Sequence, residues 1–146
     1  MSNVYPQWWD KTVTIYNKIV ASSGMISWQS KVLSGCFWKY INNVTYVNNV
    51  KMETKEVICR VPESEDYLSL EDWLSALDRT GKFTLQNGDI VILGEVTDTI
   101  NEYEKGKRST DILKKYKDVN RAFQIETFVD DTGDCLCAEH YHLKGI

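Results

Sequence analysis

The architecture follows most directly from one run of residues, Gln86-Asn87-Gly88-Asp89-Ile90-Val91-Ile92-Leu93-Gly94-Glu95-Val96. The Asn-Gly-Asp tripeptide within it tolerates positive φ angles, so a tight turn is expected there. The apolar residues 90–93 follow, and most are β-branched, as is typical of a strand that is buried on both faces. Gly94 ends the apolar run, as glycine does at a bulge or a sharp bend in a small barrel. The run therefore predicts a strongly curved central strand.

Further strands are predicted wherever β-branched and aromatic residues alternate between turn residues. The predicted strands are residues 11–16, 25–33, 36–41, 56–61, 83–85, 90–96, 122–129 and 135–143. Turns or loops are predicted at 17–24, 34–35, 42–43, 48–49 and 130–134, and longer loops at 42–55 and 97–108. Short strands at this spacing, together with two short helices, predict a mainly β fold. We expect a small β-barrel or rolled antiparallel sheet with long loops, forming a single domain over residues 1–146.

Two segments carry the signals of short helices. In the first, apolar residues recur at helical spacing after Ser69, which can cap the amino terminus, and Thr80-Gly81 is the expected stop. The recurring residues are Leu70, Trp73, Leu74 and Leu77. In the second, Ser109 or Thr110 can cap a helix with an acid in its first turn and lysines near its end, the charge order that suits the helix dipole.

The composition limits the possible functions. The chain carries 17 basic and 21 acidic side chains, so it lacks the basic footprint of a tight nucleic-acid binder. A surface that lets DNA pass without holding it remains compatible with this charge. No apolar run approaches the ~20 residues of a membrane span, so no membrane partner is expected. Residues 1–6 lack the features of a signal peptide, which predicts synthesis in a reducing cytoplasm with free thiols at the 4 cysteines.

The segment at 135–142, Cys-Leu-Cys-Ala-Glu-His-Tyr-His, is the sharpest candidate for chemistry. Two thiols and two imidazoles in a short run are typical of a zinc site or of a Cys–His nucleophile. Strand side chains alternate between faces, however, so Cys135 and Cys137 are expected to face away from His140 and His142. One regular strand then cannot bring all of them to one ion or one substrate. We therefore predict no metal, no cofactor and no catalytic residue, and a zinc- or thiol-dependent enzyme remains the less favoured alternative.

Three parts of the chain carry a family resemblance. The opening combines residues 12–18, Thr-Val-Thr-Ile-Tyr-Asn-Lys, with Trp28, Val32-Leu33 and Phe37-Trp38. The centre is the glycine-aspartate strand at 87–95, and the end is His-Tyr-His-Leu-Lys-Gly-Ile at 140–146. Together these segments resemble the small neck proteins of tailed phages, which are head–tail connector or minor capsid proteins.

The resemblance implies a structural role without catalysis. Proteins of this kind are small β-barrels with helical and loop insertions, and they assemble as rings between the portal and the tail. We therefore expect a homo-oligomeric ring, six-fold or twelve-fold, with portal or adaptor proteins and tail proteins as partners and transient contact with passing DNA. The expected location is the virion neck, after synthesis in the host bacterial cytoplasm. A head-closure stopper is the favoured function, and a head–tail adaptor or a tail terminator is the alternative.

Candidate interface residues follow from composition and position. Two adjacent indoles at 8–9 cannot share one strand face, so one of them is expected to meet a partner or to cap the barrel. The polar, turn-rich segment 42–55 is a candidate for reaching the channel or the next ring, and the basic end of the 97–108 loop is a candidate for ring contacts. The predicted interface residues are Trp8, Trp9, Asn42, Tyr46, Asn49, Lys105, Lys107 and Arg108. A binding module for a peptide or carbohydrate, using exposed Trp and Tyr, is a further alternative.

Overall fold

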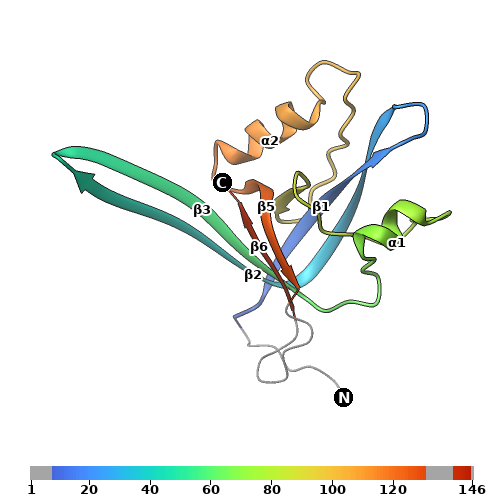
Figure 1. Cartoon of the computed structure of the whole chain (residues 1–146), viewed down its shortest axis with the longest axis horizontal. Coiled ribbons are helices and arrows are strands. Elements are labelled where there is room, and N and C mark those ends of the chain that lie inside the picture. The colour runs from blue at the N-terminus through green and yellow to red at the C-terminus, as the bar shows by residue number, and fades with distance from the viewer. Residues whose placement is uncertain (1–7, 131–139, 146) are drawn as a thin grey trace.

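The computed structural model describes residues 8–130 and 140–145. In chain order the elements are β1 (Lys11–Val20), β2 (Ile26–Val47), β3 (Val50–Pro62), α1 (Leu70–Ser75), β4 (Ile90–Leu93), α2 (Ser109–Lys117), β5 (Ala122–Asp130) and β6 (His140–Gly145). Strands dominate and the two helices are short (Figure 1), so the predicted mainly β class is confirmed.

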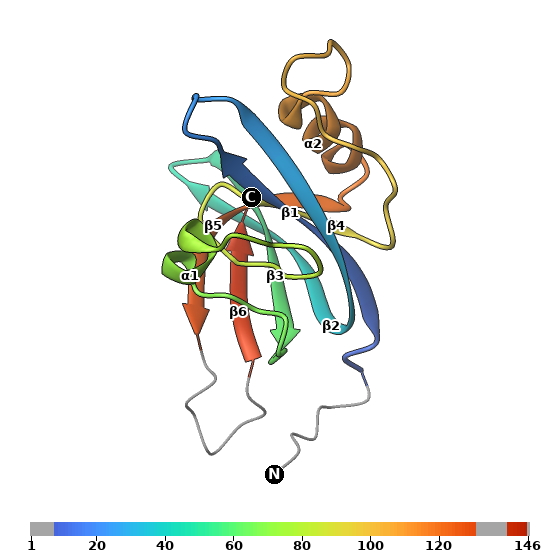
Figure 2. The same ribbon diagram turned by 90° about the vertical axis from the view of Figure 1, so that its right-hand side faces the viewer.

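The strands form a closed barrel in the order β1-β2-β3-β6-β5-β4, and β4 pairs with β1 to complete the ring. Neighbouring strands are antiparallel throughout this ring. Figure 2 views the molecule from the side of α1 and shows the strands around a common interior. Where a strand is longer than one of its neighbours, its extra residues project from the barrel and have a ladder partner on one side only.

The central strand predicted from the 86–96 run is present as β4. Ile90, Val91 and Ile92 are almost completely buried, so both faces of this strand are covered. Gly88 and Gly94 flank it with φ angles of 96° and 98°, the left-handed region that favours glycine. The Gly94 N–H donates to the carbonyl of Thr12 on β1 at 2.6 Å. This bend ends the strand at Leu93, earlier than the predicted end at residue 96.

Two apolar clusters explain why β1 and β4 are buried on both faces. The barrel interior holds the first cluster, which includes Val13, Val91 and Phe123. The second cluster lies on the outer face of the same strands, where Ile92 packs with Ile112 of α2. The helix therefore covers the side of the sheet that would otherwise expose apolar residues.

The strand β2 continues through residues 34–35, where the sequence predicted a turn between two separate strands. Gly35 adopts a φ of 72°, and the register with β1 shifts there, because β2 has an extra residue opposite Lys11 to Val13. The result is a β-bulge, which bends a strand without ending it. The prediction of separate strands at 25–33 and 36–41 was therefore wrong. The bend lets the first part of β2 pair with β1 and the second part pair with β3.

Two further predictions were wrong in detail. The prediction of a loop at 17–24 was wrong for its first half, since β1 continues to Val20, which pairs with Ile26, and of the predicted loop only residues 21–24 lie between the two strands. The predicted strand at 83–85 has only one bridge, between Tyr67 and Phe83. The Asn17 side chain of β1 bonds this segment in place of a regular backbone ladder. Its side-chain carbonyl accepts from the Thr84 N–H at 3.1 Å, and its side-chain NH2 donates to the Thr84 carbonyl at 2.6 Å.

Both helices occur in the predicted segments, but α1 ends at Ser75 with Ala76 as its cap, so the predicted stop at Thr80-Gly81 was wrong. The Ser69 hydroxyl accepts a hydrogen bond from the Asp72 N–H at 3.2 Å, which confirms the predicted cap of α1. The second helix begins at Ser109, and Arg108 rather than Ser109 or Thr110 occupies the cap position. There the Asp111 carboxylate accepts from the Arg108 N–H at 3.3 Å. Within the described part of the chain, neither helix has the length and apolar character needed to cross a membrane.

Candidate assembly interface

A long β-hairpin projects from the barrel and is the most distinctive surface of the protein. We call residues 42–55, the outer parts of β2 and β3, the arm. Every residue of the arm is exposed, whereas the barrel part of β3 alternates between buried and partly buried residues. Figure 1 shows the arm extending to one end of the longest axis, away from both helices. Its strands pair with each other, and the pairing continues to its tip, from Asn42 opposite Lys55 to Val47 opposite Val50.

The arm was predicted as a loop because it is rich in asparagine. That prediction was wrong for 42–47 and 50–55, where the residues form ladder pairs. It was right at the tip, because Asn48 and Asn49 have φ angles of 52° and 64°. Positive φ at both central residues is typical of the type I′ turns that close two-residue hairpins. Asn42 instead lies within the ladder, where its amide donates to the Glu53 carboxylate at 2.9 Å.

The two faces of the arm differ in character. Residues directly opposite each other in the ladder share a face, so Tyr46 lies beside Lys51, and Val47 lies beside Val50. The first face carries charged residues, and its members are Asn42, Val44, Tyr46, Lys51, Glu53 and Lys55. The second face carries no charge, and its members are Asn43, Thr45, Val47, Val50, Met52 and Thr54. We call Val47, Val50 and Met52 on this uncharged face the arm tip.

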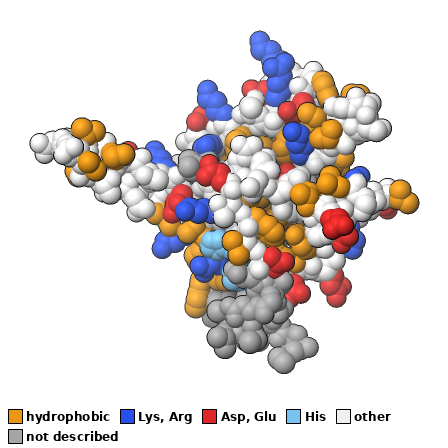
Figure 3. Space-filling view, viewed as in Figure 1, with side chains coloured by type: hydrophobic (Ala, Val, Ile, Leu, Met, Phe, Trp, Pro, Cys, Tyr) orange, Lys and Arg blue, Asp and Glu red, His pale blue; other side chains and the backbone are white. Residues whose placement is uncertain are grey.

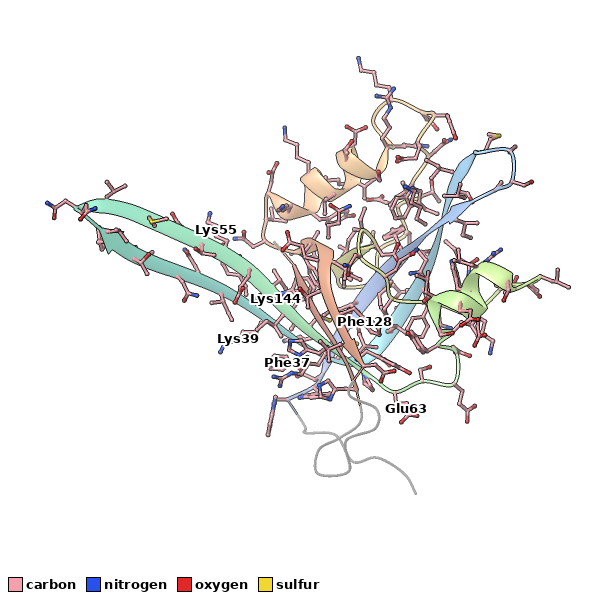
Figure 4. The ribbon with its side chains drawn as sticks, in the orientation of Figure 1. Phe37, Lys39, Lys55, Glu63, Phe128 and Lys144 are labelled. Carbon is pink, nitrogen blue, oxygen red and sulfur yellow. The ribbon has the colours of Figure 1, made fainter. Side chains whose placement is uncertain are left out.

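The base of the arm is fixed to the barrel by charged and apolar contacts. Lys144 of β6 approaches Glu56 at 3.0 Å, one residue beyond the arm. Figure 4 shows Lys55 where the arm leaves the barrel and Lys144 on the adjoining strand. Val57 is the first residue of this strand to be buried in the barrel core. The arm therefore extends from an anchored base instead of from a loose loop.

A second exposed apolar surface lies over α1. Leu70, Leu74 and Leu77 were predicted at helical spacing together with Trp73, but only Trp73 is buried. Leu74 is 67% exposed and Leu77 is fully exposed. We call Leu70, Leu74 and Leu77, with the adjoining acids Glu71, Asp72 and Asp78, the α1 face. Leu70 and Leu74 belong to the same helix as Trp73, whereas Leu77 follows the end of α1, so the spacing in the sequence did not show which residues the protein core covers.

The basic residues predicted for an interface lie in a different place from the arm. Lys105, Lys107 and Arg108 are exposed in the loop that precedes α2. Lys107 lies 3.6 Å from Glu104, so part of its charge is locally neutralised. These residues are therefore not brought together with Asn42, Tyr46 and Asn49, and an interface role for each group remains a prediction.

Asp98 holds the start of this loop against α2 and β1. Its carboxylate accepts from the Tyr116 hydroxyl at 2.6 Å and from the Lys115 ammonium at 3.1 Å. The Asp98 carbonyl accepts from the Tyr16 hydroxyl at 2.6 Å. The hydrogen bond from Tyr116 is the main reason that the pKa of Asp98 lies below its ordinary value. The loop is therefore positioned by several polar contacts.

The two adjacent indoles, both predicted as interface residues, differ in exposure. Trp8 is 67% exposed, whereas Trp9 is 8% exposed. The Trp9 ring centroid lies 6.3 Å from that of Phe37 and 5.4 Å from the His140 ring, which it meets edge to face. Trp9 thus covers the barrel beside β6, and Trp8 is the indole that remains available for a partner.

The Cys–His segment is only partly described. Cys135 and Cys137 lie outside the described residues, so their predicted orientation stays a prediction. His140 and His142 share one face of β6, as alternation requires, and their ring centroids are 6.4 Å apart. His142 accepts a hydrogen bond from the Arg60 guanidinium at 3.5 Å. Within residues 8–130 and 140–145, no group of His, Cys, Asp and Glu side chains is arranged to hold a metal ion.

The other two cysteines, Cys36 and Cys59, lie buried in the barrel core. Burial raises the pKa of the Cys36 thiol to about 12. Burial likewise raises the pKa of Cys59 well above its ordinary value, and the neighbouring Cys36 adds to the effect. Both thiols are therefore protonated at neutral pH, and a protonated buried thiol is a weak nucleophile.

The comparisons with known proteins give one assignment. A family model described as a family of unknown function (DUF6751) matches residues 8–146. The chain belongs to this family. No curated protein and no solved structure matches the chain. The family assignment names no activity, so the functional argument depends on the geometry of the arm, the α1 face and the barrel.

Proposed function

We propose that this protein is a structural subunit of the neck of a tailed phage or prophage particle. In this role it forms a ring that joins the capsid portal or adaptor to the tail and closes the DNA channel. The resemblance at both ends and at the centre of the chain suggested this function. The single observation that supports it best is the arm, because a β-hairpin exposed along its whole length has no role in the packing of its own barrel.

The arm has properties expected of a contact between subunits. Its tip exposes Val47, Val50 and Met52, each more than half exposed, on an uncharged face. Clusters of exposed apolar residues commonly mark surfaces that other proteins cover. An enzyme or a ligand-binding module, in contrast, needs convergent side chains in a cavity. The charge balance also fits a channel component, since a net negative protein holds DNA weakly.

The proposal is tested by removing the protein from particles. Particles assembled without it should show full-size heads that have lost DNA and tails that are not attached. The wild-type gene should restore complete particles, and so should Lys114→Ala, which changes an exposed residue of α2. A variant in which residues 43–54 are replaced by Asn-Gly should fail to restore them although its barrel is intact. Filled heads joined to tails in the absence of the protein would refute the neck function.

The same micrographs distinguish the alternatives. Intact filled heads together with tails of irregular length would support a tail terminator. Heads that hold DNA but lack tails would support an adaptor of the tail. Leaking heads, the expected outcome, support the stopper.

A further inference from the structure

The arm has an unpaired edge along β3. In the barrel, β3 pairs with β2 on one side and with β6 on the other, and the pairing with β6 ends at Val57. From Val50 to Glu56, β3 pairs with β2 alone, and no described strand lies along its other side, which we call the open edge. Figure 3 shows the arm standing clear of the body of the molecule. The open edge is therefore accessible to a further strand, which its backbone groups can bond.

The turn at the end of the arm fixes which backbone groups the open edge presents. Val47 and Val50 flank a two-residue turn, so they form a hydrogen-bonded pair of the ladder. Every second residue of β3 from Val50 onward then directs its N–H and carbonyl groups toward β2. Lys51, Glu53 and Lys55 lie between those residues, so their backbone groups point outward from the open edge. A strand that docks there forms its hydrogen bonds with these three residues.

The side chains of the same three residues alternate in charge. Lys51, Glu53 and Lys55 share one face of β3, because they are two positions apart. If two copies of this strand lie antiparallel with Met52 opposite Met52, Lys51 of each copy lies opposite Glu53 of the other. Charged side chains protect an open edge when like charges meet, whereas opposite charges that face each other across a ladder stabilise it. The open edge is therefore complementary to a second copy of itself.

The other antiparallel registers lack this complementarity. Pairing centred on any of the three charged residues sets like charges against each other at the centre. Pairing centred on Thr54 brings Lys51 opposite Val57, whose outer side already pairs with β6. Only the register centred on Met52 combines two pairs of opposite charges with an edge that is open over its whole overlap.

We infer that two copies of this chain pair through the open edges of their arms, antiparallel and centred on Met52. The contact is isologous, so both copies contribute the same residues, and the two arms form one four-stranded sheet. A second copy is the occupant because the charges of this edge match their own sequence in one register. The contact goes beyond the proposed function, and it stands whether or not pairs of copies are built into a ring.

Disulfide formation between copies tests the contact. Met52→Cys is introduced into the full chain together with Cys135→Ser and Cys137→Ser, and the remaining two cysteines are buried in the barrel core. Opposite residues that are not hydrogen-bonded to each other have Cα atoms about 4.5 Å apart, within the range of a disulfide. Met25→Cys in the same background is the matched control, because Met52 and Met25 are 53% and 58% exposed. On oxidation, Met52→Cys should form a linked dimer many-fold faster than Met25→Cys.

A third cysteine variant tests the register. Thr54→Cys lies on the same face and the same strand as Met52→Cys, but it should lie opposite Val50 of the second copy. Thr54→Cys should therefore link slowly to itself and rapidly to a chain that carries Val50→Cys. Self-linkage of Thr54→Cys as fast as that of Met52→Cys would overturn the inferred register.

Exchange of charges separates edge pairing from other contacts of the arm. Lys51→Glu sets acids against each other and should slow the linkage of Met52→Cys several-fold, and adding Glu53→Lys should restore it. Lys105→Glu makes the same change in net charge at an exposed residue outside the arm and should leave the linkage unchanged. Contact through the uncharged face of the arm would not respond to the exchange. That result, or equal linkage of Met52→Cys and Met25→Cys, would overturn the inference.

Discussion

Asn17 of β1 and Asp89, in the turn before β4, are joined by a buried hydrogen bond of 2.8 Å from the Asn17 amide to the Asp89 carboxylate. Asn17 also bonds both backbone groups of Thr84, so one side chain ties three segments together. The other Asp89 oxygen accepts from the Lys18 N–H at 3.2 Å and from the Gln86 amide at 3.3 Å. This network extends the β1–β4 junction beyond Tyr16 and Ile90, where the ladder between the two strands ends.

The first prediction concerns the stability of the barrel as pH changes. Burial raises the pKa of Asp89 to about 6, although its hydrogen bonds act in the opposite direction. Between its ordinary pKa and about 6, the folded state binds more protons at this site than the unfolded state. The contribution of Asp89 to stability is therefore fully present at low pH and is lost as pH rises through 6. Asp89→Asn should remove this decrease in the free energy of unfolding, measured by urea denaturation across pH.

Other carboxyls do not obscure this window. Asp66, Asp78 and Asp98 have pKa values that are lowered by hydrogen bonds, so their contributions are lost only as pH falls further into the acid range. An unchanged pH dependence in Asp89→Asn would contradict the assignment to Asp89, whatever the overall loss of stability in that variant.

The second prediction concerns Asn17 itself. Asn17→Ala leaves the Thr84 N–H and carbonyl without their partner in a buried site, together with one Asp89 oxygen. A buried polar group without a partner costs ~1–3 kcal/mol, so this variant should lose about 2–4 kcal/mol of stability in denaturant unfolding. Asn42→Ala is the matched control because its bond to Glu53 is exposed, and it should change stability by less than ~0.5 kcal/mol. Equal losses in the two variants would rule out a special role for Asn17.

The third prediction concerns the bend after β4. At Gly94, φ is +98°, and an added Cβ would lie 2.6 Å from the Arg121 guanidinium. Arg121 holds its position by donating to the Leu93 carbonyl at 2.6 Å. Gly94→Ala therefore strains the backbone and displaces the Arg121 guanidinium from the Leu93 carbonyl, and should destabilise the protein by more than ~1 kcal/mol, mainly through the backbone strain. Thermal unfolding measures this loss.

Gly106→Ala provides the control for that experiment. Its φ is +88°, and a Cβ there meets no atom within 4 Å, so it reports backbone strain alone. The difference between the two variants gives the cost of displacing the Arg121 guanidinium. If Gly106→Ala were the more destabilising change, the proposed contact with Arg121 would be excluded.

The fourth prediction tests whether the arm is independent of the barrel. Val50 and Val57 belong to the same strand, but Val50 is exposed and Val57 is buried in the core. Val50→Asp should leave the melting temperature of the monomer almost unchanged. Val57→Asp buries an unpaired carboxylate and should cost at least ~3 kcal/mol or prevent folding. Substantial destabilisation by Val50→Asp would show that the arm packs on its own barrel, which would weaken its case as an assembly surface.

Several features of this protein are determined by short-range sequence patterns. The apolar run at 90–93 follows an Asn-Gly-Asp turn and ends at Gly94, so a strand with buried residues on both faces that ends at a glycine could be predicted. Ser69 marked the start of α1 because a serine hydroxyl satisfies the free N–H groups of the first turn. Each of these depends on neighbours within a few residues.

Only the tertiary structure decided the surfaces on which function depends. The asparagines at 42–43 suggest a turn when considered locally, yet the ladder with 54–55 holds them in an extended hairpin. Leu70, Leu74 and Leu77 have core-like spacing, but α1 ends at Ser75, and of this set only Trp73 is buried. Asn17 and Thr84 are far apart in sequence, so no local pattern links them. Pairing partners and burial are long-range properties, because they depend on which segments the closed barrel brings together.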